Sequence, residues 1–147
     1  MSGLIYSKTE YAIVLAGYRD EKKVFQFYSE SSTFPGVKFP VAKNLPIFAQ
    51  LMGKSAKLFG LTSPAKQIHF DTRFSPQISL ENDNATLFIA TLTETPSNLE
   101  TQHWHTMPAL LRNMPSNRLR LSYLKAWQIL QGMFEANIKV IEEKDLN

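Results

Sequence analysis

The chain has 147 residues, of which 44% are hydrophobic and 12% aromatic, and it contains no cysteine. This composition predicts a single folded domain over residues 1–147 with a core of its own. The lack of cysteine excludes disulfides, thiolate catalysis and cysteine-ligated zinc, and it favours a reducing, intracellular and cytoplasmic location. We find no signal-peptide pattern and no apolar run of about 18 residues, so we expect no membrane span.

The net charge of +3 is unevenly distributed. Residues 36–80 carry six basic side chains against the single acid Asp71: Lys38, Lys43, Lys54, Lys57, Lys66 and Arg73. A locally basic middle fits an anionic partner such as a nucleotide, RNA or an acidic protein. A solvated lysine-rich face explains the same pattern equally well.

The first half of the chain predicts a hairpin followed by a helix. Residues 11–18 form an apolar, partly β-branched run typical of a buried strand, and 24–30 alternate as its hairpin partner. Pro35-Gly36 then marks a turn. We expect the helix to begin with Asn44 as N-cap and Pro46 in its first turn, and to end at Gly60.

This helix has two distinct faces in the sequence. The residues predicted to be buried share helical spacing: Phe48, Leu51, Met52, Ser55, Leu58 and Phe59. Gln50, Lys54 and Lys57 are predicted to form a polar face. Gly53 in the middle costs about 1 kcal/mol relative to alanine.

The second half predicts two strands, at 67–74 and centrally at 85–92, with a loop at Glu81 between them. A short strand around Trp104 precedes one or two helical turns from Pro108. A long helix over 117–135, capped by Ser116 or Asn117, follows. Its expected apolar stripe consists of Leu121, Leu124, Trp127 or Ile129, Leu130, and Met133 or Phe134. Residues 138–141 either extend this helix or form a strand. The order predicts an α+β protein, an α/β/α sandwich with helices flanking a mixed sheet.

The stretch from Phe34-Pro35-Gly36 to Gly60-Leu61 resembles the loop and helix of the Nudix family. The family signature is G-x5-E-x7-R-E-U-x-E-E-x-G-U, with U aliphatic. Phe34-Pro35-Gly36 stands where the family has its Pro-Gly-Gly turn, and Gly60-Leu61 matches the closing pair. The loop here is about three residues longer than the signature. The resemblance implies a Nudix-like mixed sheet flanked by helices.

The resemblance also shows what is missing. Counting back from Gly60, the R-E-U-x-E-E positions fall on residues 53–58, and the three glutamates are replaced by Lys54, Lys57 and Leu58. In the family those glutamates hold Mg²⁺, which requires oxygen ligands and negative charge. The resemblance therefore implies a degenerate Nudix box without metal-dependent hydrolysis by the usual route. The alternative is that Glu81 or Glu100 supplies relocated ligands.

Several side chains are candidates for binding an anionic ligand. We expect Lys54 and Lys57, with Lys38 and Arg19, to contact phosphate, and Tyr28 and Phe34 to stack on bases. The alternatives are exposed lysines that contact only water and aromatic rings that only pack in the core. His103 and His105 with Glu100 fall short of the three or four ligands of a zinc site, so we predict no metal and no cofactor.

These observations predict a non-catalytic binding or assembly module that recognises nucleotide or RNA phosphate or a partner protein. The resemblance implies this role, because family members that have lost the box serve as RNA-binding, ribosomal or regulatory subunits. Hydrolysis of a nucleoside diphosphate-linked substrate is the alternative. The final helix, with exposed Arg118, Arg120 and Lys125, is a candidate surface for a partner protein or a homodimer.

Overall fold

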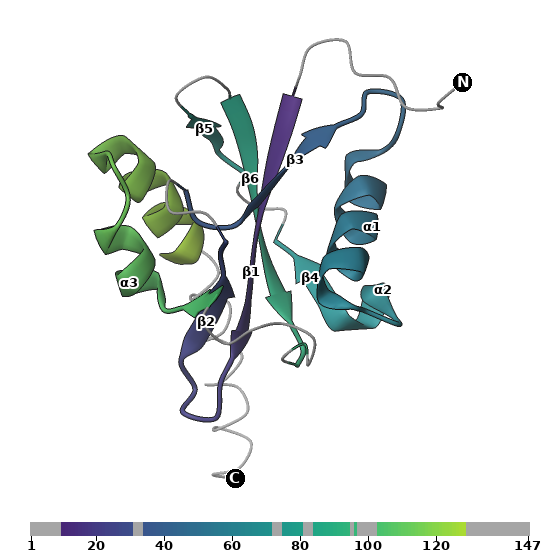
Figure 1. Ribbon diagram of the computed structural model, residues 1–147, viewed down its shortest axis with the longest axis horizontal. Coiled ribbons are helices and arrows are strands. Elements are labelled where there is room, and N and C mark those ends of the chain that lie inside the picture. Colours follow the sequence, from purple (N-terminus) through teal and green to yellow (C-terminus); the bar gives the residue numbers. More distant parts are fainter. Residues whose placement is uncertain are drawn as a thin grey trace, which may run out of the picture.

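The computed structural model describes residues 10–30, 34–71, 75–80, 84–94, 96 and 103–128. Within these residues seven strands form one mixed sheet with helices on both faces (Figure 1). In chain order the elements are β1 (Glu10–Arg19), β2 (Phe25–Tyr28), β3 (Val37–Val41), α1 (Ile47–Phe59), α2 (Pro64–Gln67), β4 (Ile68–Phe70), β5 (Gln77–Ser79), β6 (Asn84–Leu92), β7 (Trp104–His105), α3 (Met107–Arg112) and a helical segment over 117–128.

Two long parallel strands, β1 and β6, form the middle of the sheet. β2 and β3 both pair antiparallel with β1, β3 near its start and β2 near its end. β5 and β4 pair antiparallel with β6 in the same way. β6 is thus central, as its β-branched and aromatic sequence predicts, and β7 extends the sheet beyond β2.

The sheet is apolar on both faces because both faces are covered. One layer of core packs under α1 and α2 and includes Val14, Leu51 and Phe59. The other packs under α3 and the 117–128 segment and includes Leu15 and Tyr123. Figure 1 shows α1 and α2 on one side of the sheet and α3 on the other. Among the described residues, no helix combines the length and the apolar character needed to cross a membrane.

The start of α1 differs from the prediction. The helix begins at Ile47 with Pro46 in the N-cap position and no side-chain cap, so Asn44 is not the N-cap. Instead Gln50 holds the preceding loop: its amide accepts a hydrogen bond from the Ala42 N–H (2.8 Å) and donates to the carbonyls of Ala42 (2.9 Å) and Leu45 (3.0 Å). A side chain predicted to face water therefore fixes the entry to the helix.

The end of α1 follows the prediction. Gly60 has φ 63°, a left-handed conformation that favours glycine, and its N–H donates to the Ala56 carbonyl. The prediction for Phe48 is wrong, because this side chain is 42% exposed, although its ring makes edge contacts with those of Phe70 and Phe88.

The structure corrects two further predictions and adds two strands that the sequence did not predict. The strand predicted over 67–74 is shorter, since 64–67 form α2 and β4 is Ile68–Phe70. The short strands β3 and β5 were not predicted. In the helix that Ser116 caps through the Leu119 N–H, Leu121 is 65% exposed, and the buried residues are Leu119, Tyr123 and Ala126. Residues 129–147, including 138–141, lie outside the described part of the chain.

Candidate functional site

Lys54 and Lys57 lie on the rim of a groove between α1 and the sheet. This α1 groove has a volume of about 240 Å³ and is lined by Val14 of β1, Val37 and Phe39 of β3, and Lys54, Ser55, Lys57 and Leu58 of α1. Both lysines are exposed, whereas Ser55 is buried. The structure thus brings together two of the four cations predicted to bind phosphate.

The α1 groove has no acidic side chain in its lining, and helix α1 contains none. Across the described residues, no group of three or more histidine, cysteine or acidic side chains could hold a metal ion. Glu81 and Glu100, the predicted sources of relocated ligands, lie outside the described residues. Lys54, Lys57 and Leu58, which the resemblance aligns with the Nudix glutamates, therefore offer no carboxylate oxygen to a cation.

A second hollow lies on the opposite face of the sheet, between β2, β7 and α3. This β7 cleft has a volume of about 280 Å³. Its polar lining consists of Ser29, Glu30, His103, His105 and Asn113, and its apolar lining includes Phe34 and Leu110. Because Phe34 and Leu110 belong to the core layer under α3, whereas Val37 and Phe39 belong to the layer under α1, the sheet separates the cleft from the groove.

Hydrogen bonds hold the turn at Pro35-Gly36 against the β7 cleft. The buried Ser29 hydroxyl accepts from the Gly36 N–H at 3.1 Å, and the Ser29 N–H donates to the His103 carbonyl at 2.9 Å. From the helix over 117–128, the buried Tyr123 hydroxyl donates to the Pro35 carbonyl at 2.7 Å. Burial raises the pKa of the Tyr123 hydroxyl, which keeps it protonated as the donor.

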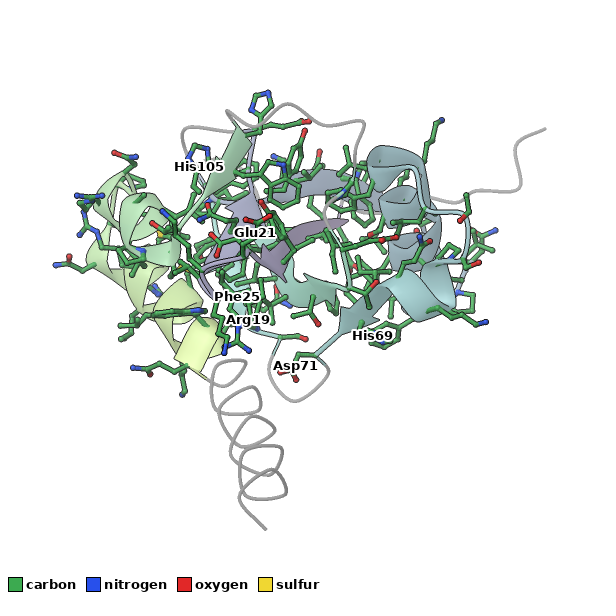
Figure 2. All side chains as sticks on the ribbon, turned by 90° about the horizontal axis from the view of Figure 1, so that it is seen from below. Arg19, Glu21, Phe25, His69, Asp71 and His105 are labelled. Atoms are coloured by element: carbon green, nitrogen blue, oxygen red, sulfur yellow. The ribbon has the colours of Figure 1, made fainter. Side chains whose placement is uncertain are left out.

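The four predicted phosphate ligands do not converge. Lys38 lies on the β7-cleft face of the sheet, with its ammonium 4.6 Å from the Tyr11 ring centroid and 5.8 Å from that of Phe34. Arg19 lies in the β1–β2 hairpin, where its Nε donates to the Lys23 carbonyl at 3.4 Å. Figure 2 places Arg19 beside Phe25 and away from His105. Only the Lys54–Lys57 pair shares one site.

The hairpin turn around Arg19 is stabilised by Asp20. The carboxylate of Asp20 accepts from the N–H groups of Lys22 and Val24, both at 2.9 Å, and from the Gln26 amide at 3.1 Å. The hydrogen bond from Val24 is the main cause that lowers the pKa of Asp20, and the Gln26 amide and the Lys22 N–H lower it further. These contacts explain a folded turn rather than a binding site.

The two predicted stacking residues have different outcomes. Phe34 is half-buried and lines the β7 cleft. Tyr28 is only 3% exposed, and its ring makes edge contacts with Phe59, His103 and Trp104. The expectation for Tyr28 is therefore corrected, because its ring is enclosed by core side chains.

Sequence reasoning missed most of the cleft's polar groups. His103 and His105 were considered with Glu100 as metal ligands, but the structure places them beside Glu30, whose carboxylate accepts a hydrogen bond from the Tyr28 hydroxyl. The chain's other histidine, His69, lies in β4 at the far end of the sheet from His105 in β7 (Figure 2). Glu30, His103 and His105 come together through the pairing of β2 with β7. Because these strands are far apart in the sequence, no local pattern reveals the cluster.

Comparison with known proteins shows what this arrangement resembles. No family model matches the sequence, and no curated protein matches it. The crystal structure of the C. elegans Ap4A hydrolase matches with a TM-score of 0.64 at 9% identity, covering 83% of this chain and 98% of that one. A binary complex of a C. elegans Ap4A hydrolase matches with a TM-score of 0.61 at 10% identity, covering 85% and 99%. The likeness shows a Nudix-like fold, which confirms the predicted mixed sheet flanked by helices.

Proposed function

We propose that this chain binds a nucleotide in the β7 cleft and does not hydrolyse it through helix α1. The observation that carries the proposal is the position of Phe34, an aromatic ring in a cleft whose polar lining includes a carboxylate, two imidazoles and an amide. An aromatic face stacks on any nucleobase, and polar side chains beside it form hydrogen bonds with the edge of the base.

Lys38 lies beside this cleft without lining it, and it supports a phosphate-bearing ligand there. Its ammonium lies near the ring of Phe34 and on the same face of the sheet. A phosphate attached to a base stacked on Phe34 would be within the range of this cation, and a charge-assisted hydrogen bond is about twice as strong as a neutral one. Lys54, Lys57 and Arg19 lie elsewhere, so they have no part in this site.

The non-hydrolytic part of the proposal follows from α1. Metal-dependent hydrolysis requires a divalent cation that neutralises the phosphates and activates water. Lys54, Lys57 and Leu58 occupy the matching positions, and two ammonium groups repel such an ion.

Hydrolysis remains the second candidate, because both structural neighbours are Ap4A hydrolases. In that case Glu81, Glu100 or other acidic residues outside the described part would supply the metal ligands. A partner-binding role without a small ligand is the third candidate. One ligand panel separates all three.

The test is isothermal titration of AMP, ADP-ribose, Ap4A and a short single-stranded RNA, with and without Mg²⁺ or Mn²⁺. We expect binding without metal, and Phe34→Leu to weaken it about tenfold, since stacking on one base is worth about 1–3 kcal/mol. Phe48→Leu is the matched control, because Phe48 is an exposed phenylalanine on the other face of the sheet.

Three outcomes would overturn the proposal. Equal affinity in wild type and Phe34→Leu would exclude stacking in the β7 cleft. Release of hydrolysis products that depends on Mg²⁺ or Mn²⁺, as monitored by chromatography, would establish that the chain is a hydrolase. No binding of any nucleotide or RNA, together with co-purification of another protein, would establish the assembly role.

A further inference from the structure

We propose that the α1 groove is a second binding site, for a phosphate ester with an apolar body. It lies across the sheet from the β7 cleft, so a ligand there is distinct from the proposed nucleotide. Three features of the groove converge on this chemistry: a pair of cations, an apolar floor and a buried hydroxyl group without a hydrogen-bond partner.

The cations are Lys54 and Lys57, three residues apart on one helix. This spacing places their side chains as neighbours on the same face, about 5–6 Å apart at Cβ. Among the described residues, neither ammonium group takes part in an ion pair or a hydrogen bond. Since α1 contains no acidic residue, the groove rim is complementary in charge to a dianionic group such as a phosphate.

The floor selects what the phosphate carries. Between the two lysines and the sheet, the lining consists of Val14, Val37, Phe39 and Leu58. These side chains gain free energy by contact with another apolar group and gain nothing from a sugar or from inorganic phosphate. The volume of about 240 Å³ accommodates a short alkyl chain or one aromatic ring.

Ser55 is the independent observation that points to a ligand. It is 2% exposed, lines the groove, and its hydroxyl has no hydrogen-bond partner in the described structure. A buried hydroxyl left unpaired is destabilising, and native proteins pair nearly all such groups. The ester oxygen of a phosphate held by Lys54 and Lys57 would accept a hydrogen bond from Ser55 while the chain of the ester lies on the floor.

The experiment titrates hexyl phosphate, inorganic phosphate and 1-hexanol into the full chain by calorimetry. We expect hexyl phosphate to bind at least about tenfold more tightly than either of the other two, because only it uses both the rim and the floor. Lys54→Ala/Lys57→Ala should weaken hexyl phosphate about tenfold or more. The control Lys22→Ala/Lys66→Ala removes the same charge at exposed lysines outside the groove and should leave affinity unchanged.

Ser55→Ala provides a second, opposed readout. Removing an unpaired buried hydroxyl should raise the unfolding midpoint of the free protein and lower the affinity for hexyl phosphate at the same time. Phe34→Leu should leave hexyl phosphate binding intact, which separates this site from the β7 cleft. The proposal is overturned if hexyl phosphate does not bind, if both lysine double variants bind it equally, or if Ser55→Ala binds it as tightly as wild type.

Discussion

Replacing Tyr123 with phenylalanine tests how the turn beside the β7 cleft is held. The Tyr123 ring is fully buried, and its hydroxyl makes a 2.7 Å hydrogen bond to the Pro35 carbonyl, 88 residues away in sequence. Phenylalanine keeps the ring and its packing, so Tyr123→Phe removes the hydrogen bond with little change in shape. The loss should cost about 1–3 kcal/mol, because a buried carbonyl is left without this donor.

Urea unfolding followed by circular dichroism at pH 7 measures this cost. With a slope of about 2 kcal/mol per molar urea, the midpoint should fall by roughly 0.5–1.5 M. Tyr18→Phe is the matched control: Tyr18 is half-buried, and its hydroxyl makes no hydrogen bond within the described residues. A midpoint for Tyr123→Phe within about 0.2 M of wild type, after this control, would refute the reasoning.

The pH dependence of stability provides an independent test of the same hydrogen bond. Burial raises the pKa of Tyr123 in the folded protein above the value of about 10 that applies when it is unfolded. The hydroxyl therefore makes its full contribution to stability below pH 10. Above pH 10 Tyr123 ionises in the unfolded protein before it does so in the folded one, and this lowers the free energy of unfolding. Above pH 10 the free energy of unfolding of the wild type should fall by about 1.4 kcal/mol per pH unit through this ionisation, and that of Tyr123→Phe should not. The stability gap between the two should narrow there; a constant gap up to pH 12 would contradict the assignment.

Three further substitutions test the turns and the helix. Gly36→Ala should destabilise by at least about 1–3 kcal/mol in urea unfolding, because φ is +106° and an added Cβ would lie 2.7 Å from the Val14 carbonyl oxygen; an unchanged midpoint would contradict this. Gly53→Ala should stabilise by about 0.5–1 kcal/mol, since a Cβ there meets no atom within 4 Å, and a lower melting temperature would argue against it. Asp20→Asn should make the free energy of unfolding less sensitive to acid. The pKa of Asp20 is lower in the folded than in the unfolded protein, so its carboxylate stabilises the fold above the unfolded pKa, and this contribution is lost as the pH falls through the folded pKa. Identical acid unfolding curves for both proteins would show that Asp20 contributes nothing.

The two ends of α1 show which helix boundaries a sequence can predict. Gly60 ends the helix at φ 63°, a conformation that glycine adopts at no steric cost, and that information is local. At its start α1 has no side-chain cap, and the loop before it is held instead by the amide of Gln50, which reaches back eight residues to Ala42. A glutamine on the polar face of a helix can hydrogen-bond to many different groups or to water, so its actual partner becomes known only from the fold.

The short strands were missed for a related reason. β3 has five residues, one of them Pro40, and β5 has three, so neither has enough alternation to be distinguished from a loop. Both strands form because β2 and β4 cover only one end of the outer edges of β1 and β6, which leaves the other end of each edge open for pairing. Their existence is a property of the long strands more than of their own sequence.

The alternation within β3 could have corrected one expectation before the structure. Val37 and Phe39 both pack in the layer under α1, so Lys38 between them must face the other side of the sheet. A strand at 37–41 would therefore have excluded Lys38 from any site containing Lys54. By contrast, the pairing of Lys54 with Lys57 follows from helical spacing alone, and the α1 groove brings these two together.

The same helix shows how this Nudix-like fold forms although α1 contains no acidic residue. The frame depends on backbone positions with little freedom: Gly36 is packed against β1, and Gly60 ends α1 in a left-handed turn. Lys54 and Lys57 are exposed, and their charges contribute little to packing, so their positions tolerate any side chain that suits water. Ser55 is the exception, since its side chain is buried and its hydroxyl has no hydrogen-bond partner among the described residues. A hydroxyl there is unfavourable for the empty fold, and a ligand in the groove is the physical reason we propose for it.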